Sequence, residues 1–300
     1  MQNLVFDKSI NNLKMNSTII CLGAFDSFHL GHQKLLNKTL ELGEKNNLQT
    51  IFFSFNNVAN NKLKFKPLIL DYDSKMEVVR KMHFDYFLAF NANDSNLQIL
   101  PVEFLKILKN NYNVKQVIAG KDFHFGFKAK GNNKLLQTFF GKKNVTLIHD
   151  VSYHNRKVSS TMIRKFLHKN NLVKANMLMK QPYTIKGMVV EAKHLGRKLD
   201  FPTVNIILEN KLLINYGSFY TKTFVDNKWY YSMSCYREID NHLVFETHIL
   251  NFNQNIYGKN IKIYVLDFMR PNLKFTSENQ LKYQLNIDLK NTVEFFKLLK

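Results

Sequence analysis

Two histidines stand three residues apart in the segment AFDSFHLGHQKLL, which directly follows a short apolar run. We expect His29 and His32 to lie in the turn and at the start of the next helix. A helix N-terminus offers unpaired N–H groups and a partial positive charge, and two imidazoles add hydrogen bonds to the same phosphate oxygens. Gly31 between them permits close approach of the backbone to a triphosphate. The pattern indicates a phosphate site, with a plain helix cap and a metal site as alternatives, although HxxH has no acidic partner at a familiar offset.

A loop further along the chain could hold a planar ligand. GKDFHFGFKAKG, at residues 120–131, follows another apolar run, and its glycines bracket Asp122, Phe123 and Phe125. The two rings suit a flat heterocycle, and the carboxylate supplies a polar group beside it. We expect this loop to form one wall of a binding pocket.

Hydroxyl groups open the helix that we predict for VSSTMIRKFL, at residues 158–167. Ser159, Ser160 and Thr161 stand in a row, and Arg164 follows about one turn later. Hydroxyls at a helix N-terminus can hold anionic oxygens, and an arginine can clamp a leaving pyrophosphate. Taken alone, the run also describes an ordinary helix cap. Together with the two earlier segments it indicates a single phosphate site.

The second half of the chain carries a smaller polar group. In FPTVNI, Thr203 and Asn205 lie two residues apart, so both side chains face the same side of a strand. A hydroxyl and an amide oxygen so placed can hold Mg²⁺ with ATP phosphates, although hydrogen bonds to local backbone are an equal alternative. Glu246 lies in the apolar run LVFETHILNF, where burial would favour a general base. A strand glutamate on the solvated face is the alternative there.

The elements that must position these residues change in character near residue 182. Through residue 181, short apolar runs alternate with amphipathic helical stretches, which predicts a parallel sheet with ligands at the carboxyl ends of its strands. After Pro182 come β-branched and aromatic runs divided by Gly, Asn and Asp, typical of an antiparallel barrel or sandwich. A final helix follows Ser277, its expected N-cap. We therefore predict an α/β fold with two domains, at residues 1–181 and 182–300.

Charge and composition narrow the classes of protein. The chain has 43 Lys and Arg against 23 Asp and Glu, a net charge of +20, which suits nucleic acid, an anionic membrane surface or polyphosphate substrates. The lysines are scattered and form no basic block, which argues against nucleic acid, and no apolar run reaches the roughly 20 residues of a membrane span. Two cysteines, Cys21 and Cys235, suggest neither a zinc site nor a disulfide framework, so we expect a cytoplasmic protein.

Three segments of the first half, AFDSFHLGHQKLL, GKDFHFG and VSSTMIR, resemble in order and separation the adenylyltransferase module of prokaryotic bifunctional riboflavin kinase/FAD synthetases. The resemblance continues into that family's riboflavin kinase module through GMVVEAKHLGRKLDFPTVNI, FETHILNF, IYGKNIKI and the C-terminal helix, so it covers nearly the whole chain. The HxGH segment alone fits any nucleotidyltransferase or a class I aminoacyl-tRNA synthetase. Its joint occurrence with FPTxN is much more specific.

The resemblance implies a Rossmann-like domain that joins ATP to FMN, giving FAD and pyrophosphate, and a barrel that phosphorylates riboflavin to FMN with ATP and Mg²⁺. The implied catalytic residues are His29, His32, Arg164 and Glu246. Residues implied to bind ATP or its phosphates are Gly23, Phe25, Gly31, Ser159, Ser160, Thr161, Gly196 and Arg197. Residues implied to seat adenosine or flavin are Asp122, Phe123 and Phe125, and those implied to hold the metal are Thr203 and Asn205.

The chain departs from the family pattern in both halves. Ser27 replaces the usual glycine after Phe-Asp, and SFNNVANN stands where a Thr-Phe-acidic-Pro-His-Pro stretch is usual. In the barrel, Ala192 and Asp200 replace glycines, and MSCYREID replaces Asn-Ile-Gly with a following Arg-Pro-Thr. These departures leave an alternative in which only the adenylyltransferase is active and the barrel is a degenerate flavin-binding domain. An RNA-associated protein and a nucleotidyltransferase for another cofactor are the remaining hypotheses.

Overall fold

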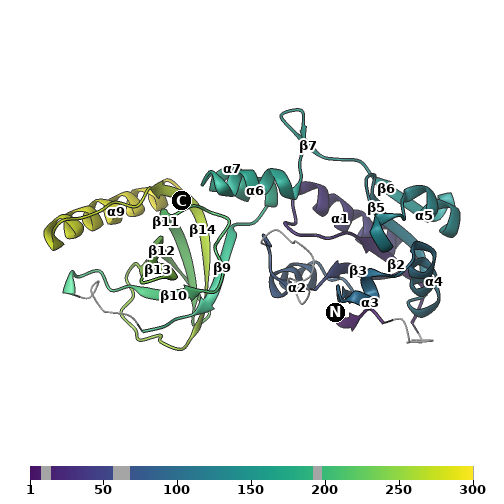
Figure 1. Ribbon diagram of the computed structural model, residues 1–300, viewed down its shortest axis with the longest axis horizontal. Coiled ribbons are helices and arrows are strands. Elements are labelled where there is room, and N and C mark those ends of the chain that lie inside the picture. Colours follow the sequence, from purple (N-terminus) through teal and green to yellow (C-terminus); the bar gives the residue numbers. More distant parts are fainter. Residues whose placement is uncertain (8–14, 57–67, 192–197, 300) are drawn as a thin grey trace. The chain divides into compact units, whose positions relative to one another are not determined.

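The computed structural model describes residues 1–7, 15–56, 68–191 and 198–299. Within it the chain forms two compact units, Met1–Ser160 and Thr161–Lys300. In Figure 1 the first is coloured from purple to teal and the second from teal to yellow. None of the helices in the described part of the chain is long and apolar enough to cross a membrane.

The first unit is built on a six-stranded sheet in which every pairing is parallel, in the order β1-β4-β3-β2-β5-β6. Its strands are β1 (Gln2–Val5), β2 (Thr18–Leu22), β3 (Gln49–Phe55), β4 (Tyr86–Phe90), β5 (Val114–Gly120) and β6 (Val145–Ile148). Its helices are α1 (Leu30–Lys45), α2 (Tyr72–Lys81), α3 (Asp94–Leu97), α4 (Pro101–Asn111) and α5 (Asn133–Phe140), with short 3₁₀ turns η2 (Phe127–Ala129) and η3 (Lys142–Asn144). A hairpin of β7 (Ser152–Tyr153) and β8 (Arg156–Lys157) follows β6.

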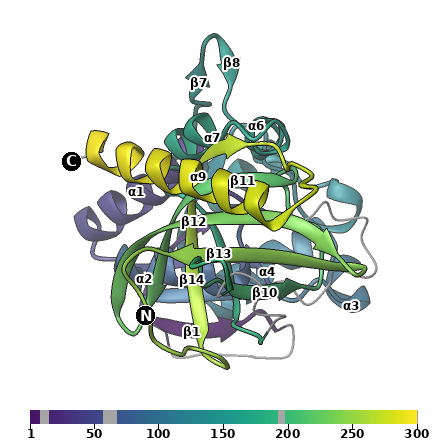
Figure 2. The same cartoon turned by 90° about the vertical axis from the view of Figure 1, so that its left-hand side faces the viewer.

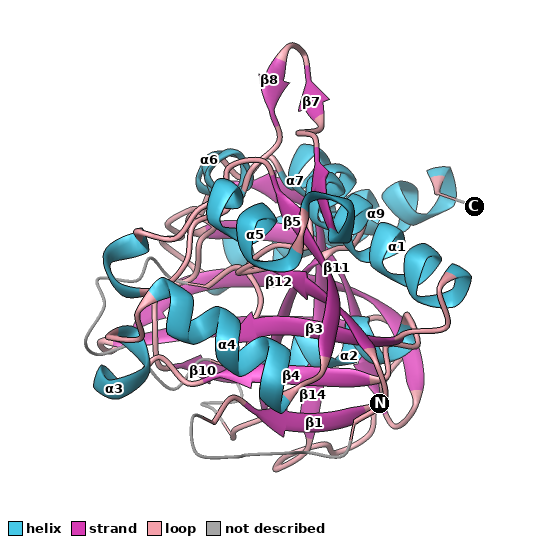
Figure 3. Cartoon of the chain, turned by 90° about the vertical axis from the view of Figure 1, so that its right-hand side faces the viewer, coloured by secondary structure: helices cyan, strands magenta, loops and turns pink. Residues whose placement is uncertain are grey.

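Both faces of this sheet are covered, which explains why its strands are apolar at successive positions. All five residues of β2 are buried. Ile20 and Leu22 belong to the core shared with α4, whose Leu105 and Leu108 are buried in it, and Figure 3 shows α4 and α5 lying across that face. The opposite face lies under α1 and α2, where Phe52 is packed among other aromatic rings. The predicted parallel sheet with helices on both sides is confirmed.

The strand order reverses direction between β2 and β5, which are hydrogen-bonded neighbours in the middle of the sheet. From β2 the chain runs outward to β3 and β4, and it then crosses back to β5 and β6. Crevices form at such a switch point, outside the carboxyl ends of the strands. The turn after β2 and the loop after β5 therefore face the same crevice.

The second unit is a nearly closed antiparallel barrel. Its six strands follow the order β10-β13-β12-β11-β14-β9, and a bridge between Val190 and Asn205 brings the chain after β9 against β10. The strands are β9 (Tyr183–Met188), β10 (Val204–Leu208), β11 (Gly217–Val225), β12 (Lys228–Ile239), β13 (His242–Ile249) and β14 (Asn260–Arg270). Helix α9 (Glu278–Leu298) lies along the barrel (Figure 2), and Ser277 is its N-cap, as predicted. The predicted fold class is thus confirmed in both halves.

Two helices, α6 (Ser160–His168) and α7 (Leu172–Met179), follow the sheet in the sequence, and barrel residues hold α7. Asn176 on α7 donates to the carbonyls of Val265 and Leu266 on β14, at 2.9 and 3.2 Å, and accepts from the backbone N–H of Tyr183. Along the chain, the boundary between the two compact units accordingly falls after Ser160, at the start of α6. The domain boundary at residues 181/182 remains a prediction.

Candidate active sites

A cavity of about 370 Å³ opens at the carboxyl ends of β2 and β5 in the first unit. His29 and His32 reach it from the start of α1, Asp122 from the loop after β5, and Ser159 from the segment before α6. The sheet thus brings residues of all three sequence segments to one place.

His29 is the N-cap of α1. Its Nδ1 accepts hydrogen bonds from the backbone N–H groups of Gly31 and His32, at 3.1 and 3.3 Å. Because Nδ1 is the acceptor, the proton of the neutral ring is on Nε2, which is then a donor. The helix cap and the phosphate contact are therefore compatible, since each uses a different ring nitrogen.

The two imidazoles of the HxGH segment stack, with ring centroids 3.8 Å apart and planes 13° apart. Burial lowers the pKa of His29 to about 4. Burial, with a smaller effect of His29, holds the pKa of His32 well below its usual range. Both rings are therefore neutral near pH 7 and act as hydrogen-bonding groups rather than as cations.

Three other residues expected at this site occupy different positions around it. A Cβ atom at Gly31 would lie 3.1 Å from Cε1 of His29, so the glycine leaves room for the capping ring. Gly23 lines the cavity. Phe25 is fully buried and its ring lies 5.1 Å from that of His32. Phe25 supports the imidazole pair from the core instead of lining the cavity.

The serine that replaces the family's glycine connects two of the motifs. Ser27 is buried, and its hydroxyl lies 3.1 Å from that of Ser160. The turn before α1 is thus tied to the hydroxyl-rich segment. Thr161 and Arg164 belong to the second unit, and their phosphate-binding roles remain predictions.

The loop after β5 is held by side chains on both sides. Asn133 donates to the carbonyls of Gly120 and Lys121, at 3.0 and 2.7 Å. At Gly126, φ is +72°, and a Cβ atom would lie 2.9 Å from Pro101, so only glycine suits this position. These contacts hold the loop that carries Phe123 and Phe125, whose rings stack with centroids 5.7 Å apart.

A lysine absent from the sequence prediction stands at the rim of the same cavity. Lys157 donates to Asp122 at 2.6 Å and pairs with Asp150 at 2.8 Å. The lysine lowers the pKa of the Asp122 carboxyl through their hydrogen bond. Lys157 directly precedes the VSST run. A positive charge beside that motif is the one sequence feature that could have indicated a place for Lys157 in the site.

Aromatic rings form an apolar side of the cavity. Those that line it are Phe53, Phe55, Phe90, Phe104, Phe123 and Phe125. Only the last two were predicted, because the others lie in strands and a helix where they read as ordinary core residues. Such a surface suits a flat heterocycle, while the histidines and hydroxyls suit its phosphates.

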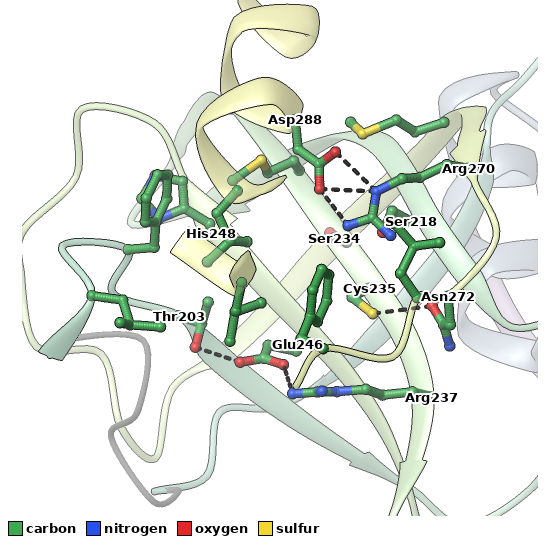
Figure 4. Close-up of a pocket in the computed structure, with 18 residues that line it drawn as sticks. Thr203, Ser218, Ser234, Cys235, Arg237, Glu246, His248, Arg270, Asn272 and Asp288 are labelled. Atoms are coloured by element: carbon green, nitrogen blue, oxygen red, sulfur yellow. Dashed lines mark hydrogen bonds and ion pairs between the residues drawn. The ribbon is translucent and has the colours of Figure 1, made fainter. Parts of the chain in front are cut away.

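A second cavity, of about 180 Å³, lies in the barrel unit (Figure 4). Glu246 on β13 is held at both carboxylate oxygens. Thr203 donates to Oε1 at 2.8 Å, and Arg237 on β12 donates to Oε2 at 2.5 Å. Arg237 lies in the segment MSCYREID, which departs from the family pattern. The structure places this arginine in contact with the predicted general base.

Asn205 shares a strand face with that carboxylate. Asn205 and Glu246 are directly opposed in the pairing of β10 with β13, so their side chains project from the same side. Thr203 lies just before β10, two residues away on the same side. The predicted metal-binding pair and the predicted base are therefore neighbours.

The other side of the barrel cavity is largely apolar. Its lining includes Met233, Met269, Leu273, Leu281 and Leu285. Helix α9 closes it, and Asp288 on that helix accepts three hydrogen bonds from Arg270, at 2.5 to 3.1 Å. Burial raises the pKa of the Cys235 thiol at this cavity to about 11, so the thiol is uncharged.

The remaining barrel predictions concern the segment before FPTVNI. Gly196, Arg197 and Ala192 lie outside the described residues. Asp200 has φ of +66°, a backbone conformation natural to the glycine it replaces and tolerated by aspartate. Its carboxylate pairs with Lys282 on α9 at 2.6 Å. The negative charge of Asp200 is thus matched by a lysine.

The crevice at the carboxyl ends of β2 and β5, with an HxGH turn beside it, is typical of a nucleotidyltransferase. The barrel carries a second, separate cavity with polar groups on one side and apolar residues on the other. A family model for FAD synthetase matches residues 12–162, and one for riboflavin kinase matches residues 179–296. The chain belongs to the family of bifunctional riboflavin kinase/FMN adenylyltransferases.

Relatives of that description extend over nearly the whole chain. One from Buchnera aphidicola of Schizaphis graminum is 33% identical and covers 97% of this chain and 99% of its own length. Another, from Listeria monocytogenes, is 31% identical and covers 94% and 93%. A crystal structure titled macrolide-efflux protein, from Streptococcus pneumoniae, is 24% identical, with a TM-score of 0.86 over 97% of this chain and 99% of that one. It shows the same fold.

Proposed function

We propose that this chain phosphorylates riboflavin to FMN in its barrel and adenylylates FMN to FAD in its parallel-sheet unit, consuming ATP in both steps. The observation that carries this function is that both family models match, each over a unit that holds its own pocket. Bifunctional relatives aligned from end to end favour two activities over an adenylyltransferase with an inert barrel.

The adenylyl-transfer site works by positioning. The phosphate of FMN is already a nucleophile, so the protein must place it in line with the α-phosphorus of ATP and stabilise the developing charge. His29 donates from Nε2 to an α-phosphate oxygen, and His32 lies stacked against it to hold the ring. Ser159, Ser160, Thr161 and Arg164 bind the β- and γ-phosphates. Pyrophosphate leaves without a covalent enzyme intermediate.

The flat parts of both substrates need an apolar seat in the same cavity. The phenylalanine rings there supply stacking surface. Asp122 with Lys157 supplies a polar edge that can hydrogen-bond a heterocycle or ribose. Gly23 and Gly31 keep the backbone close to the phosphates.

The kinase site has oxygen groups that fit Mg²⁺. Thr203 and Asn205 present a hydroxyl and an amide on one strand face, and hard oxygen ligands suit this ion. Within the described residues no three His, Cys, Asp or Glu side chains gather to hold a metal, so phosphates of ATP would complete its ligands. Bound there, the ion would neutralise charge on the β- and γ-phosphates.

Glu246 is the general base of the kinase step. The side chain is 20% exposed, and its two oxygens are oriented by Thr203 and Arg237. It accepts the proton of the riboflavin 5′-hydroxyl as that oxygen attacks the γ-phosphorus of ATP. The apolar wall below α9 would hold the flavin ring, and Gly196 and Arg197 would cover the phosphates.

Purified protein tests both activities when each substrate is supplied separately with MgATP. Riboflavin should yield FMN and then FAD, and FMN should yield FAD and one pyrophosphate. Chromatography separates the flavins. FAD from supplied FMN without any FMN from riboflavin would favour the inert barrel, and no FAD from FMN would refute the first activity.

A further inference from the structure

A lysine is buried beside the adenylyl-transfer cavity, on the helix that follows β3. Lys75, on α2, is 2% exposed. Its Nζ donates to the carbonyl of Ala24 at 3.2 Å and to the hydroxyl of Ser54 at 3.4 Å. Ala24 lies in the turn between β2 and α1 and lines the cavity. The ammonium group thus lies directly behind the turn that leads into the HxGH segment.

The fold does not require a charge at this position. Burying an ammonium group is unfavourable unless it is well paired. The carbonyl of Ala24 also accepts from Ser54 at 2.9 Å, so it would keep a partner if the lysine were absent. An apolar side chain of the same length would fill the space without the desolvation. A role in packing alone therefore does not explain the lysine.

The two histidines of the adenylyl-transfer site supply no positive charge to a bound triphosphate. Both imidazoles are neutral, and the charge of Lys75 contributes to keeping His32 so. Burial lowers the pKa of Lys75 to about 8, while Asp26 and Asp71 act in the opposite direction. Lys75 is therefore mostly charged at pH 7. The groups that face it are the carbonyl of Ala24 and the carboxylate of Asp26 in the turn, Ser54 on β3, Asp71 at the N-cap of α2 and His32 on α1.

We propose that Lys75 supports adenylyl transfer by placing a buried positive charge directly behind the turn at Ala24, where the charge strengthens ATP binding. This inference rests on the proposed adenylylation at this site. A triphosphate brings several negative charges against the turn, and a cation under a low-dielectric surface attracts it more strongly than an exposed one does. The lysine thus acts on ATP through its electrostatic field, without touching the substrate.

Lys75→Met tests this in the full chain, with Lys81→Met as the matched control. Lys81 is on the same helix, but its side chain is 71% exposed and pairs with Glu77. For Lys75→Met we expect kcat/KM for ATP in FAD formation to fall about tenfold at pH 7, mainly through KM. Its Tm should be no lower than that of the wild type, and FMN formation from riboflavin should be unchanged. Lys81→Met should match the wild type throughout.

The pH dependence separates charge from packing. The pH dependence of kcat/KM for ATP reports the titration of groups in the free enzyme. Lys75 loses its proton as the pH rises through about 8, so the wild-type value should fall there, whereas that of Lys75→Met should not. The two values should therefore converge by about pH 9.5. Lys75→Gln, which keeps a donor to Ala24 without the charge, should behave like Lys75→Met and serves if that variant is insoluble.

Three results would overturn the inference: wild-type kcat/KM in Lys75→Met, an equal loss at every pH together with a lower Tm, or full activity in Lys75→Gln. Each requires that the wild-type protein makes FAD. If the wild type makes no FAD from FMN and ATP, the proposed function fails instead, which the same assay reports separately.

Discussion

A single imidazole, that of His29, both caps α1 and presents a donor to the cavity. The bonds from two backbone amides to Nδ1 set its tautomer. Its neighbour His32 is neutral and stacked on it. At the scale of residues, then, the HxGH segment supplies neutral hydrogen-bonding groups at a helix N-terminus and no cation.

Substitutions at His29 can separate the cap from the catalytic contact. His29→Ala should slow FAD formation about 100-fold, the effect of losing a preorganised donor, and destabilise the fold by about 1 kcal/mol through loss of the cap. His29→Asn keeps a capping oxygen but not the Nε2 donor, so it should recover stability without activity. Steady-state kinetics and thermal melts report the two effects. His83→Asn, at an exposed histidine that does not line the cavity, is the control; equal activity in His29→Asn and wild type would remove the donor role.

The low pKa of His29 also predicts how stability depends on pH. The folded-state pKa of about 4 lies below the usual value of 6.5, so the unfolded chain binds the extra proton first. The contribution of His29 to stability is therefore complete above pH 6.5 and is lost as the pH falls toward 4. Urea unfolding of His29→Asn between pH 4 and 7 should show a shallower decline than the wild type. An identical slope would place the His29 pKa near its ordinary value.

Arg237 orients the general base of the kinase site. Arg237→Met would remove one of the two side-chain contacts that hold Glu246 in Figure 4 and leave the hydrogen bond from Thr203, so we expect kcat for FMN formation to fall about tenfold. FAD formation from supplied FMN should be unaffected, because Arg237 lines the barrel cavity and not the cavity at the carboxyl ends of β2 and β5. Wild-type kinase turnover in this variant would show that the ion pair is dispensable.

At the scale of elements, α9 closes the barrel pocket through one buried ion pair and two aromatic stacks. Arg270 and Asp288 form the ion pair, and Tyr220 with Phe295 and Tyr231 with Phe296 form the stacks. Since the apolar residues of α9 line the pocket, its attachment should control flavin binding.

Asp288→Asn should loosen this helix. Removing one charge of a buried pair leaves Arg270 uncompensated and destabilises by about 3 kcal/mol. The KM for riboflavin should rise while that for FMN at the adenylyl site stays constant. Lys282→Met, which removes an exposed pair with Asp200, should cost under about 1 kcal/mol. A riboflavin KM unchanged in Asp288→Asn would disconnect α9 from flavin binding.

The elements that sequence predicted well are those with strong local patterns. The apolar strands from Thr18 to Ile148, the amphipathic helices between them and the cap at Ser277 follow from periodicity and end signals. The edge strand β1 was missed, because it is only four residues long, two of them polar, and pairs along one side only, with β4. Helix α5 was missed because it is short and follows a glycine-rich loop.

Site residues divide in the same way. His29, Gly31 and Ser159 stand in local motifs and line the cavity. Lys75, Lys157 and Arg237 carry no local motif, and only tertiary packing brings them to the sites. Phe25 stands in the same motif, but its ring is buried in the core and does not line the cavity, so the binding role that the resemblance implies stays a prediction.

At the scale of the whole molecule, the two pockets are each built within one compact unit. The fragment 1–181 should therefore fold and convert FMN to FAD. It exposes the face of α7 that the barrel buries, which should lower its solubility.

The fragment 1–160 lacks Thr161 and Arg164, so it should fold but form FAD at least about 100-fold more slowly than the fragment 1–181. An inactive 1–181 beside an active full chain would show that the units depend on each other.

If this chain holds two independent transferase sites, single substitutions should remove each activity separately, and a pair of such variants tests this. The measurement is the time course of FMN and FAD formed from riboflavin and MgATP by the wild type, Glu246→Gln and His29→Ala. We predict that Glu246→Gln makes no FMN from riboflavin yet converts supplied FMN to FAD within about twofold of the wild type. His29→Ala should accumulate FMN with little FAD. Loss of both activities in either folded variant, or of neither in both, would contradict the assignment of separate sites.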